Sequence, residues 1–172
     1  MFNNFLELAE ARYSVRQYSD KPIEQEKLDR ILRAGQVAPT AMNAQPQRIL
    51  VLKSNEAVAK IRTLTRFHFN APMYLLICAN TAESYKAVDG NDSAEVDTAI
   101  VTTHMMMQAF DEGIGTCWVR GFDANMVSAA FGLPEHIEPV ALLPIGYPAE
   151  DAKPYPGAHE KRKPITETVK YL

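Results

Sequence analysis

The chain has 172 residues, of which 47% are hydrophobic and 23% are charged, and its net charge is -3 at pH 7. This composition is typical of one globular domain with a hydrophobic core, and it excludes fibrous and disordered proteins. A slightly acidic chain offers no broad attraction for nucleic acids or membrane surfaces, so an anionic ligand would need a local basic site.

The start of the chain, MFNNFLELAEARYS, lacks the basic residues and continuous apolar segment of a secretion signal, and no apolar run approaches the length of a membrane span. Two cysteines, Cys78 and Cys117, are too few for a disulfide framework and indicate a reducing compartment. The four histidines show no metal-ligand spacing. We therefore expect a cytoplasmic protein without a metal site.

A short amphipathic helix begins the chain, with Phe2, Phe5, Leu6 and Ala9 on one face. The sequence RYSVRQY follows at residues 12–18, which we call the arginine segment. If it is extended, Arg12 and Arg16 point the same way, and with Ser14 they suit a phosphate or another anion. Taken alone, the arginine segment fits a solvated edge strand better.

A second helix is predicted from about Glu24 to Gln36, with apolar residues on its inner face. It leads into APTAMNAQP at residues 38–46, which we call the proline loop. Small and amide side chains between prolines make a rigid loop with many hydrogen-bond donors, which can hold a flat polar ring. The simpler interpretation is a plain connection into a strand at 48–52.

A helix at about 55–65, a buried strand at 73–78 and a polar segment at 81–92 precede a long helix that begins near Ser93. After its first turn this helix has no wide polar face, so it must be buried on more than one side. A chain of this length hardly covers such a helix twice, which predicts a homodimer packed through it. If this helix is the interface, a charge placed at Met106 should disrupt dimerisation.

The long helix ends at Gly113-Ile114-Gly115 and leads into a strand at 116–119, the reverse of the order in a dinucleotide-binding motif. Cys117 in this strand is interpreted as a packing residue rather than a redox thiol. A helix from Asp123 to Phe131 and a buried strand at 138–144 follow. The polar, proline-containing tail carries Lys161-Arg162-Lys163, which is either a solvated charge run or part of an anion pocket.

Five motifs in this order resemble the nitroreductase family of flavin mononucleotide (FMN) enzymes: RYSVRQY, APTAMNAQP, the long helix with GIGTCWV, PIGYP and KRKP. The resemblance covers nearly the whole chain. It implies an α+β fold with a mixed, mostly antiparallel central sheet flanked by helices, built as an intertwined homodimer. It also implies one FMN-binding domain over residues 1–172, with a tail at about 149–172 that wraps the partner subunit.

The resemblance further implies which residues bind FMN at the subunit interface. Contacts with the phosphate, the ribityl chain and the pyrimidine edge would come from Arg12, Tyr13, Ser14 and Arg16. The other subunit would supply Pro39, Thr40, Ala41, Asn43 and Gln45. The residues expected against or near the isoalloxazine are Pro144, Ile145, Gly146, Trp118 and Val119. Arg162 would meet the phosphate.

In such an enzyme NADH or NADPH delivers a hydride to flavin N5, leaves, and is replaced by a nitroaromatic, a quinone or a similar acceptor, which gives ping-pong kinetics. The chemistry takes place on the flavin, so no side-chain nucleophile is expected. Two alternatives stay open at this point. One is a flavoprotein of the same fold with a specialised reaction, and the other is a flavin-binding sensor with little turnover.

Overall fold

Four antiparallel strands form the sheet, in the order β1, β2, β4, β3. The computed structural model describes residues 2–172. Its strands are β1 (Gln47–Leu52), β2 (Met73–Asn80), β3 (Gly115–Thr116) and β4 (Ile137–Gly146). Its helices are α1 (Phe5–Ala11), α2 (Gln25–Gln36), the short 3-10 helix η1 (Ala41–Asn43), α3 (Asn55–Leu64), α4 (Ala94–Asp111), α5 (Ala124–Phe131) and α6 (Ile165–Thr168). The expected α+β class is confirmed.

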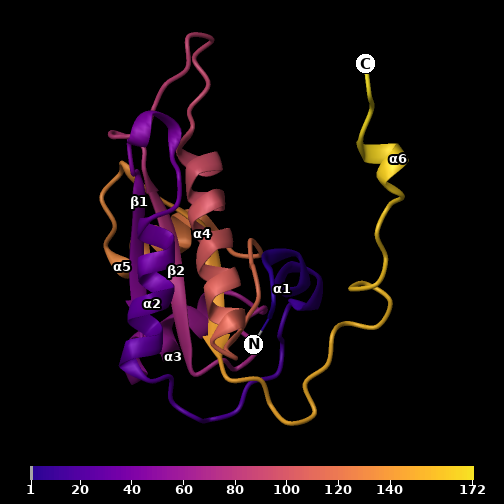
Figure 1. The fold of residues 1–172 in the computed structure, drawn as a ribbon. Helices are drawn as coiled ribbons and strands as arrows, with labels where there is room; N and C mark the ends of the chain where they lie inside the picture. Colours follow the sequence, from indigo (N-terminus) through magenta and orange to yellow (C-terminus); the bar gives the residue numbers. More distant parts are fainter. Residues whose placement is uncertain (1) are drawn as a thin grey trace.

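The helices cover both faces of the sheet, as Figure 1 shows. All eight residues of β2 are buried, and successive side chains enter different cores. Leu75 and Ile77 pack with residues of α2 and α4, whereas Leu76 packs with residues of α3 and α5. The central strand therefore reads as a continuous apolar run because it has no solvent-facing side.

Local sequence signals begin and end several helices. The Ser54 side chain accepts a hydrogen bond from the Ala57 N–H at 3.2 Å and begins α3. Asp123 does the same for α5, with the Met126 N–H at 3.1 Å. That helix ends at Gly132, whose φ of +62° lies in the left-handed region that favours glycine.

Helix α4 packs one side into the core and leaves another apolar side uncovered by its own chain. A Cβ at Gly35 would lie 2.8 Å from Met105 Cγ, so α2 and α4 approach closely there. Met106 is only 8% exposed and belongs to the same core, so a charge there would disturb the folded chain itself. The expectation that Met106 reports on the interface was therefore wrong. Val96 is 62% exposed, and Ile100 is only partly buried.

Two segments project from this body. Residues 81–92, which we call the hairpin, extend beyond the start of α4 and are held by a bridge between Lys86 and Asp92 (Figure 1). The tail, residues 149–172, runs past α1 and then away from the sheet (Figure 1). Every residue from 160 to 172 is exposed, including the apolar Ile165 and Leu172.

Candidate functional site

The arginine segment lies along the edge of the sheet in the extended conformation that its alternating pattern suggests. Helix α1 ends at Ala11, just before Arg12, and the Val15 N–H then donates to the Thr116 carbonyl at 2.9 Å. Ser14 pairs with Thr116 in a parallel bridge. A Cβ at Gly115 would lie 2.5 Å from Val15 Cγ2, so only glycine lets the segment come this close to β3. The buried Val15 thus fixes the position of its polar neighbours.

Positive charge gathers around this segment. Arg12 is half-buried, and its Nη1 is a buried donor with no acceptor among residues 2–172. Burial and the nearby charge of Arg162 both lower the pKa of Arg12. A buried guanidinium without an acceptor is costly, and a bound anion would remove that cost. The two ends of the chain therefore bring together two arginines whose chemistry suits an anion.

Arg16 and two aromatic rings form the outer side of this site. The Arg16 guanidinium carbon lies 5.8 Å from the centroids of both the Phe69 and Tyr155 rings. Its Nη1 donates to the Ser14 carbonyl at 3.2 Å. Cation–π contacts with two rings restrict a long side chain that is otherwise exposed. Arg16 is consequently held with its charge facing solvent.

Cys117 lies beside Arg12, Ser14 and Arg16 of the arginine segment. Burial raises the pKa of its thiol, although the charge of Arg16, the Ser14 side chain and the charge of Arg12 oppose that shift. A buried thiol with a raised pKa stays protonated and is a poor nucleophile. This agrees with the interpretation of Cys117 as a packing residue.

A small cavity of about 270 Å³ adjoins Arg16 and is lined by Phe69, Trp118, Val119 and neighbouring residues. Trp118 also packs against the core that contains α4, and Val119 belongs to the core on the opposite face. Pockets that enclose a cofactor-sized ligand are typically about 300 to 1,000 Å³. The cavity of one chain is therefore slightly smaller than such pockets.

The end of β4 borders the same region with its backbone. Pro144, Ile145 and Gly146 are all buried, and Ile145 packs in the core. The Tyr18 hydroxyl lies 3.1 Å from the Pro144 carbonyl oxygen. A Cβ at Gly146 would lie 2.8 Å from Pro72 Cδ. Because these residues are buried within their own chain, a ligand here would contact main-chain atoms.

Aromatic residues connect the tail to the arginine segment. The Tyr13 ring lies edge-on to the rings of Phe110 and His159, with centroids 6.2 and 6.5 Å away. Arg162 is held by its own turn, because its Nη1 donates to the Ala158 carbonyl at 3.3 Å. The tail thus lies against the arginine segment, with Arg162 close enough to Arg12 for its charge to lower the pKa of Arg12.

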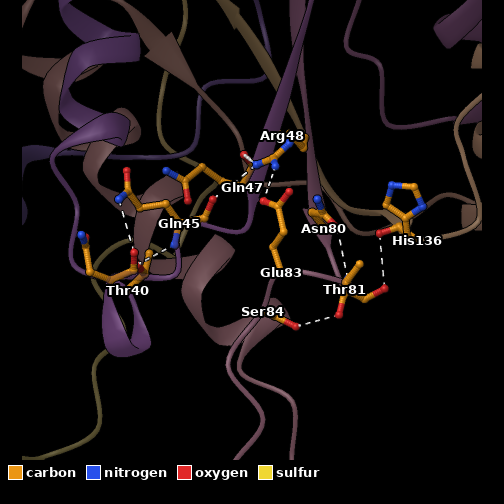
Figure 2. Close-up of polar contacts among 11 residues, drawn as sticks. Thr40, Gln45, Gln47, Arg48, Asn80, Thr81, Glu83, Ser84 and His136 are labelled. Carbon is orange, nitrogen blue, oxygen red and sulfur yellow. Dashed lines mark hydrogen bonds and ion pairs between the residues drawn. The ribbon is translucent and has the colours of Figure 1, made fainter.

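The proline loop is held in a strained turn. Met42, Asn43 and Gln45 all have positive φ, between 50° and 54°, although none is glycine. Hydrogen bonds within the loop hold this shape, including Gln45 N–H to Thr40 Oγ1 at 3.1 Å (Figure 2). Such strain persists only where the surroundings enforce it, and it is frequent at functional sites.

Contacts at the base of the proline loop tie it to the start of the hairpin. Arg48 donates to the Gln45 carbonyl at 3.3 Å and pairs with Glu83, as Figure 2 shows. The Asn80 N–H donates to the Pro46 carbonyl at 2.7 Å. The loop therefore belongs to the Asn80 end of β2.

The arginine segment lies at the other end of the sheet. Met73 begins β2 and pairs with Ile145, next to the β3 residues that the arginine segment contacts. The eight residues of β2 correspond to about 23 Å. The structure therefore brings together Arg12, Tyr13, Ser14, Arg16, Trp118, Val119, the end of β4 and Arg162. It does not bring Pro39, Thr40, Ala41, Asn43 or Gln45 to them within one chain.

Comparisons with known proteins settle the family. The nitroreductase family model matches residues 9–66 and 64–147. This chain belongs to the nitroreductase family. A nitroreductase family protein from Clostridium difficile 630 has a crystal structure that is 38% identical in sequence, covers 98% of each chain and superposes with a TM-score of 0.90.

Other members carry more specific names. The FMN reductase [NAD(P)H] of Bacillus subtilis strain 168 is 27% identical, over 80% of this chain and 63% of its own. A crystal structure of an Exiguobacterium sibiricum protein in complex with FMN has a TM-score of 0.84 and covers 100% of this chain and 99% of its own. At 22% identity that structure supports the fold alone.

Several residues near the site were not predicted from the sequence. Phe69 and Tyr155 were missed, although aromatic residues in otherwise polar segments are a usable signal. The contact between Asp97, an acid within an apolar helix, and the backbone of the proline loop was also not predicted. Within residues 2–172, no helix has the length and apolar character needed to cross a membrane.

Proposed function

We propose that this protein is an FMN-dependent oxidoreductase that takes a hydride from NADH or NADPH and passes it to a small oxidised acceptor, such as a nitroaromatic or a quinone. Membership of the nitroreductase family and the names of its relatives support this class of reaction. The single observation that carries the proposal is the buried, unpartnered Nη1 of Arg12 beside Arg162. That pair has the chemistry of a phosphate site.

FMN, when bound, supplies the centre that accepts and donates the hydride. Arg12 and Arg162 bind the phosphate, and Ser14 adds a hydroxyl donor. The charge of Arg16 stabilises negative charge at the edge of the ring system, because Phe69 and Tyr155 hold the guanidinium before the ligand arrives. Trp118, Phe69 and the end of β4 exclude water from one side of the site.

We also propose that two copies form a homodimer through the uncovered side of α4. Ala41 contacts α4 at Asp97, and Tyr13 contacts it at Phe110, so the two motifs lie thirteen residues apart, or about 20 Å of helix. A two-fold axis near the exposed Thr103 and His104 would bring each proline loop to the partner's arginine segment. Such an axis supplies the residues that one chain lacks.

Exposed apolar groups support this arrangement. Val96 and Ile100 line one hollow on α4. Met107 lines a second hollow together with Phe5 of α1, which is 68% exposed. Apolar residues of the tail have no cover in their own chain, and wrapping the partner subunit would bury them. The free, buried Cys78 and Cys117 suit a reducing cytoplasm.

The test is the visible absorption spectrum of the purified protein, followed by anaerobic addition of NADH and then NADPH. We expect a flavin spectrum that bleaches with at least one donor and returns when a quinone or a nitroaromatic is added. Bound flavin that neither donor bleaches would favour a sensor. No binding of added FMN would refute the proposed function.

A further inference from the structure

Asp97 is the one charged side chain that is buried among residues 2–172, and it is 2% exposed. It lies in the first turn of α4. Its Oδ1 accepts a hydrogen bond from the Ala41 N–H at 2.9 Å, and its Oδ2 accepts one from Ser93 Oγ at 2.7 Å. Both carboxylate oxygens therefore have partners, one of which is the backbone of the proline loop.

A carboxylate is unfavourable in this environment unless its surroundings compensate. The two hydrogen bonds and the positive end of the α4 dipole provide that compensation. An apolar side chain of similar size at this position would need no such compensation. It would not, however, accept the hydrogen bond from the Ala41 N–H.

The bond to Ala41 fixes the strained turn relative to α4. The next two residues, Met42 and Asn43, have positive φ, and the other bonds around them stay within the loop. Ser93 connects the same carboxylate to the hairpin, since the Ser93 N–H donates to the Tyr85 carbonyl at 2.9 Å. Asp97 therefore holds the proline loop and the hairpin at the start of the helix.

We propose that Asp97 is a positioning residue for the FMN site of the partner subunit. It holds the proline loop in the shape that the partner's arginine segment needs, while lying about 20 Å of helix from the arginine segment of its own chain. This inference rests on the proposed function. Its distinctive consequence is that the effect of a change at Asp97 appears in the other subunit's site.

The first experiment titrates FMN into apoprotein variants and follows the quenching of flavin fluorescence. Asp97→Ala removes both hydrogen bonds, and we expect the Kd for FMN to rise about tenfold or more. Asp97→Asn keeps an acceptor for Ala41 and should stay within about threefold of wild type. The matched control is Thr102→Val, because the buried Thr102 hydroxyl bonds only to Thr98 of its own helix, at 2.6 Å.

A second variant removes the donor instead of the acceptor, which covers the case that Asp97→Ala does not fold. Ala41 begins η1, where proline is tolerated, and Thr40 before it is extended, with φ of -135° and ψ of 156°. Ala41→Pro should therefore fold and lose FMN affinity as Asp97→Ala does. Wild-type affinity in either variant would overturn the inference.

The decisive experiment uses a mixed dimer of one Asp97→Ala chain and one Arg12→Ala chain, purified with two different tags. If Asp97 acts on the partner's site, one site carries both changes and the other carries neither, so the mixed dimer binds one FMN with wild-type affinity. If Asp97 acts within its own chain, both sites are impaired and neither binds tightly, which would refute the proposal. Wild-type protein that binds no FMN would instead refute the proposed function.

Discussion

The arginine segment and the proline loop are both expected to hold one cofactor, yet they are built in opposite ways. Backbone pairing with β3 fixes the arginine segment, and its side chains carry charge. Turn hydrogen bonds fix the proline loop, which has strained φ values and no charged side chain. The arginine segment is suited to bind an anion, whereas the proline loop is suited to fix the shape of a binding site.

A change that separates the arginine segment of one chain from the proline loop of its partner should have the largest effect on FMN binding. Ile100→Glu places a charge on the uncovered side of α4, where burial without a counter-ion costs several kcal/mol. We expect a folded monomer that does not retain FMN, as measured by analytical ultracentrifugation and absorption. Met126→Glu on α5 is the control, since Met126 is an exposed apolar residue of another helix. A dimeric Ile100→Glu protein would argue against this interface.

Removing the charge of the arginine segment should come next. Arg12→Ala deletes a charge-assisted contact with phosphate that contributes about 1.5 to 3 kcal/mol, so the Kd for FMN should rise about 10- to 150-fold. The midpoint of thermal unfolding of the apoprotein should not fall, because Arg12 Nη1 has no acceptor within residues 2–172. The exposed Arg33→Ala is the control. Unchanged FMN affinity would mean that Arg12 does not contact the phosphate.

Gly115→Ala tests how the arginine segment is fixed to the sheet. The added methyl group meets Val15 Cγ2 at 2.5 Å, and overpacking of this kind costs about 1 to 3 kcal/mol. Urea denaturation measures the loss. Adding Val15→Ala should restore part of it, since the two side chains compete for one space. Equal losses in the single and double variants would mean that the contact is not the cause.

The smallest expected effect is a response to acid on the side of the arginine segment. A hydrogen bond from Tyr147, 2.5 Å from Glu24 Oε2, is the main cause that lowers the pKa of Glu24 to about 2. A depressed carboxylate pKa contributes stability above the ordinary value of 4.5, and this is lost as the pH falls towards 2. Tyr147→Phe should therefore unfold at a lower temperature than wild type at pH 6, and the difference should shrink by pH 3. A constant difference would exclude this linkage.

Local features of the fold could be predicted from the sequence. The helix expected from about Glu24 to Gln36 is α2, Gln25–Gln36, and the one expected at about 55–65 is α3. These helices could be predicted because the capping residues and the apolar spacing that define each one lie within a few residues of each other in the sequence. The expectation for Met106 was wrong for a related reason. When a helix is apolar nearly all round, its sequence does not show which side faces the core. Packing against Gly35 of α2 decides this.

The site was predictable as a set of motifs but not as an arrangement. The anion chemistry of Arg12, Ser14 and Arg16 follows from residue types and spacing in one short segment. The rings around Arg16 come from residues 69 and 155, and the partner of Asp97 lies 56 residues away in the chain. Contacts at such separations leave no periodic pattern in the sequence.

In the proposed dimer, the distance between the two motifs would make the amount of bound FMN depend on protein concentration. When charge and shape for one site come from two chains, each FMN is held only while the chains are associated. Mass action then makes FMN retention fall on dilution below the dimer dissociation constant, and added FMN shifts assembly in the opposite direction. Because α4 forms the proposed interface, the visible absorbance of the bound flavin would then report the fraction of chains in the dimer.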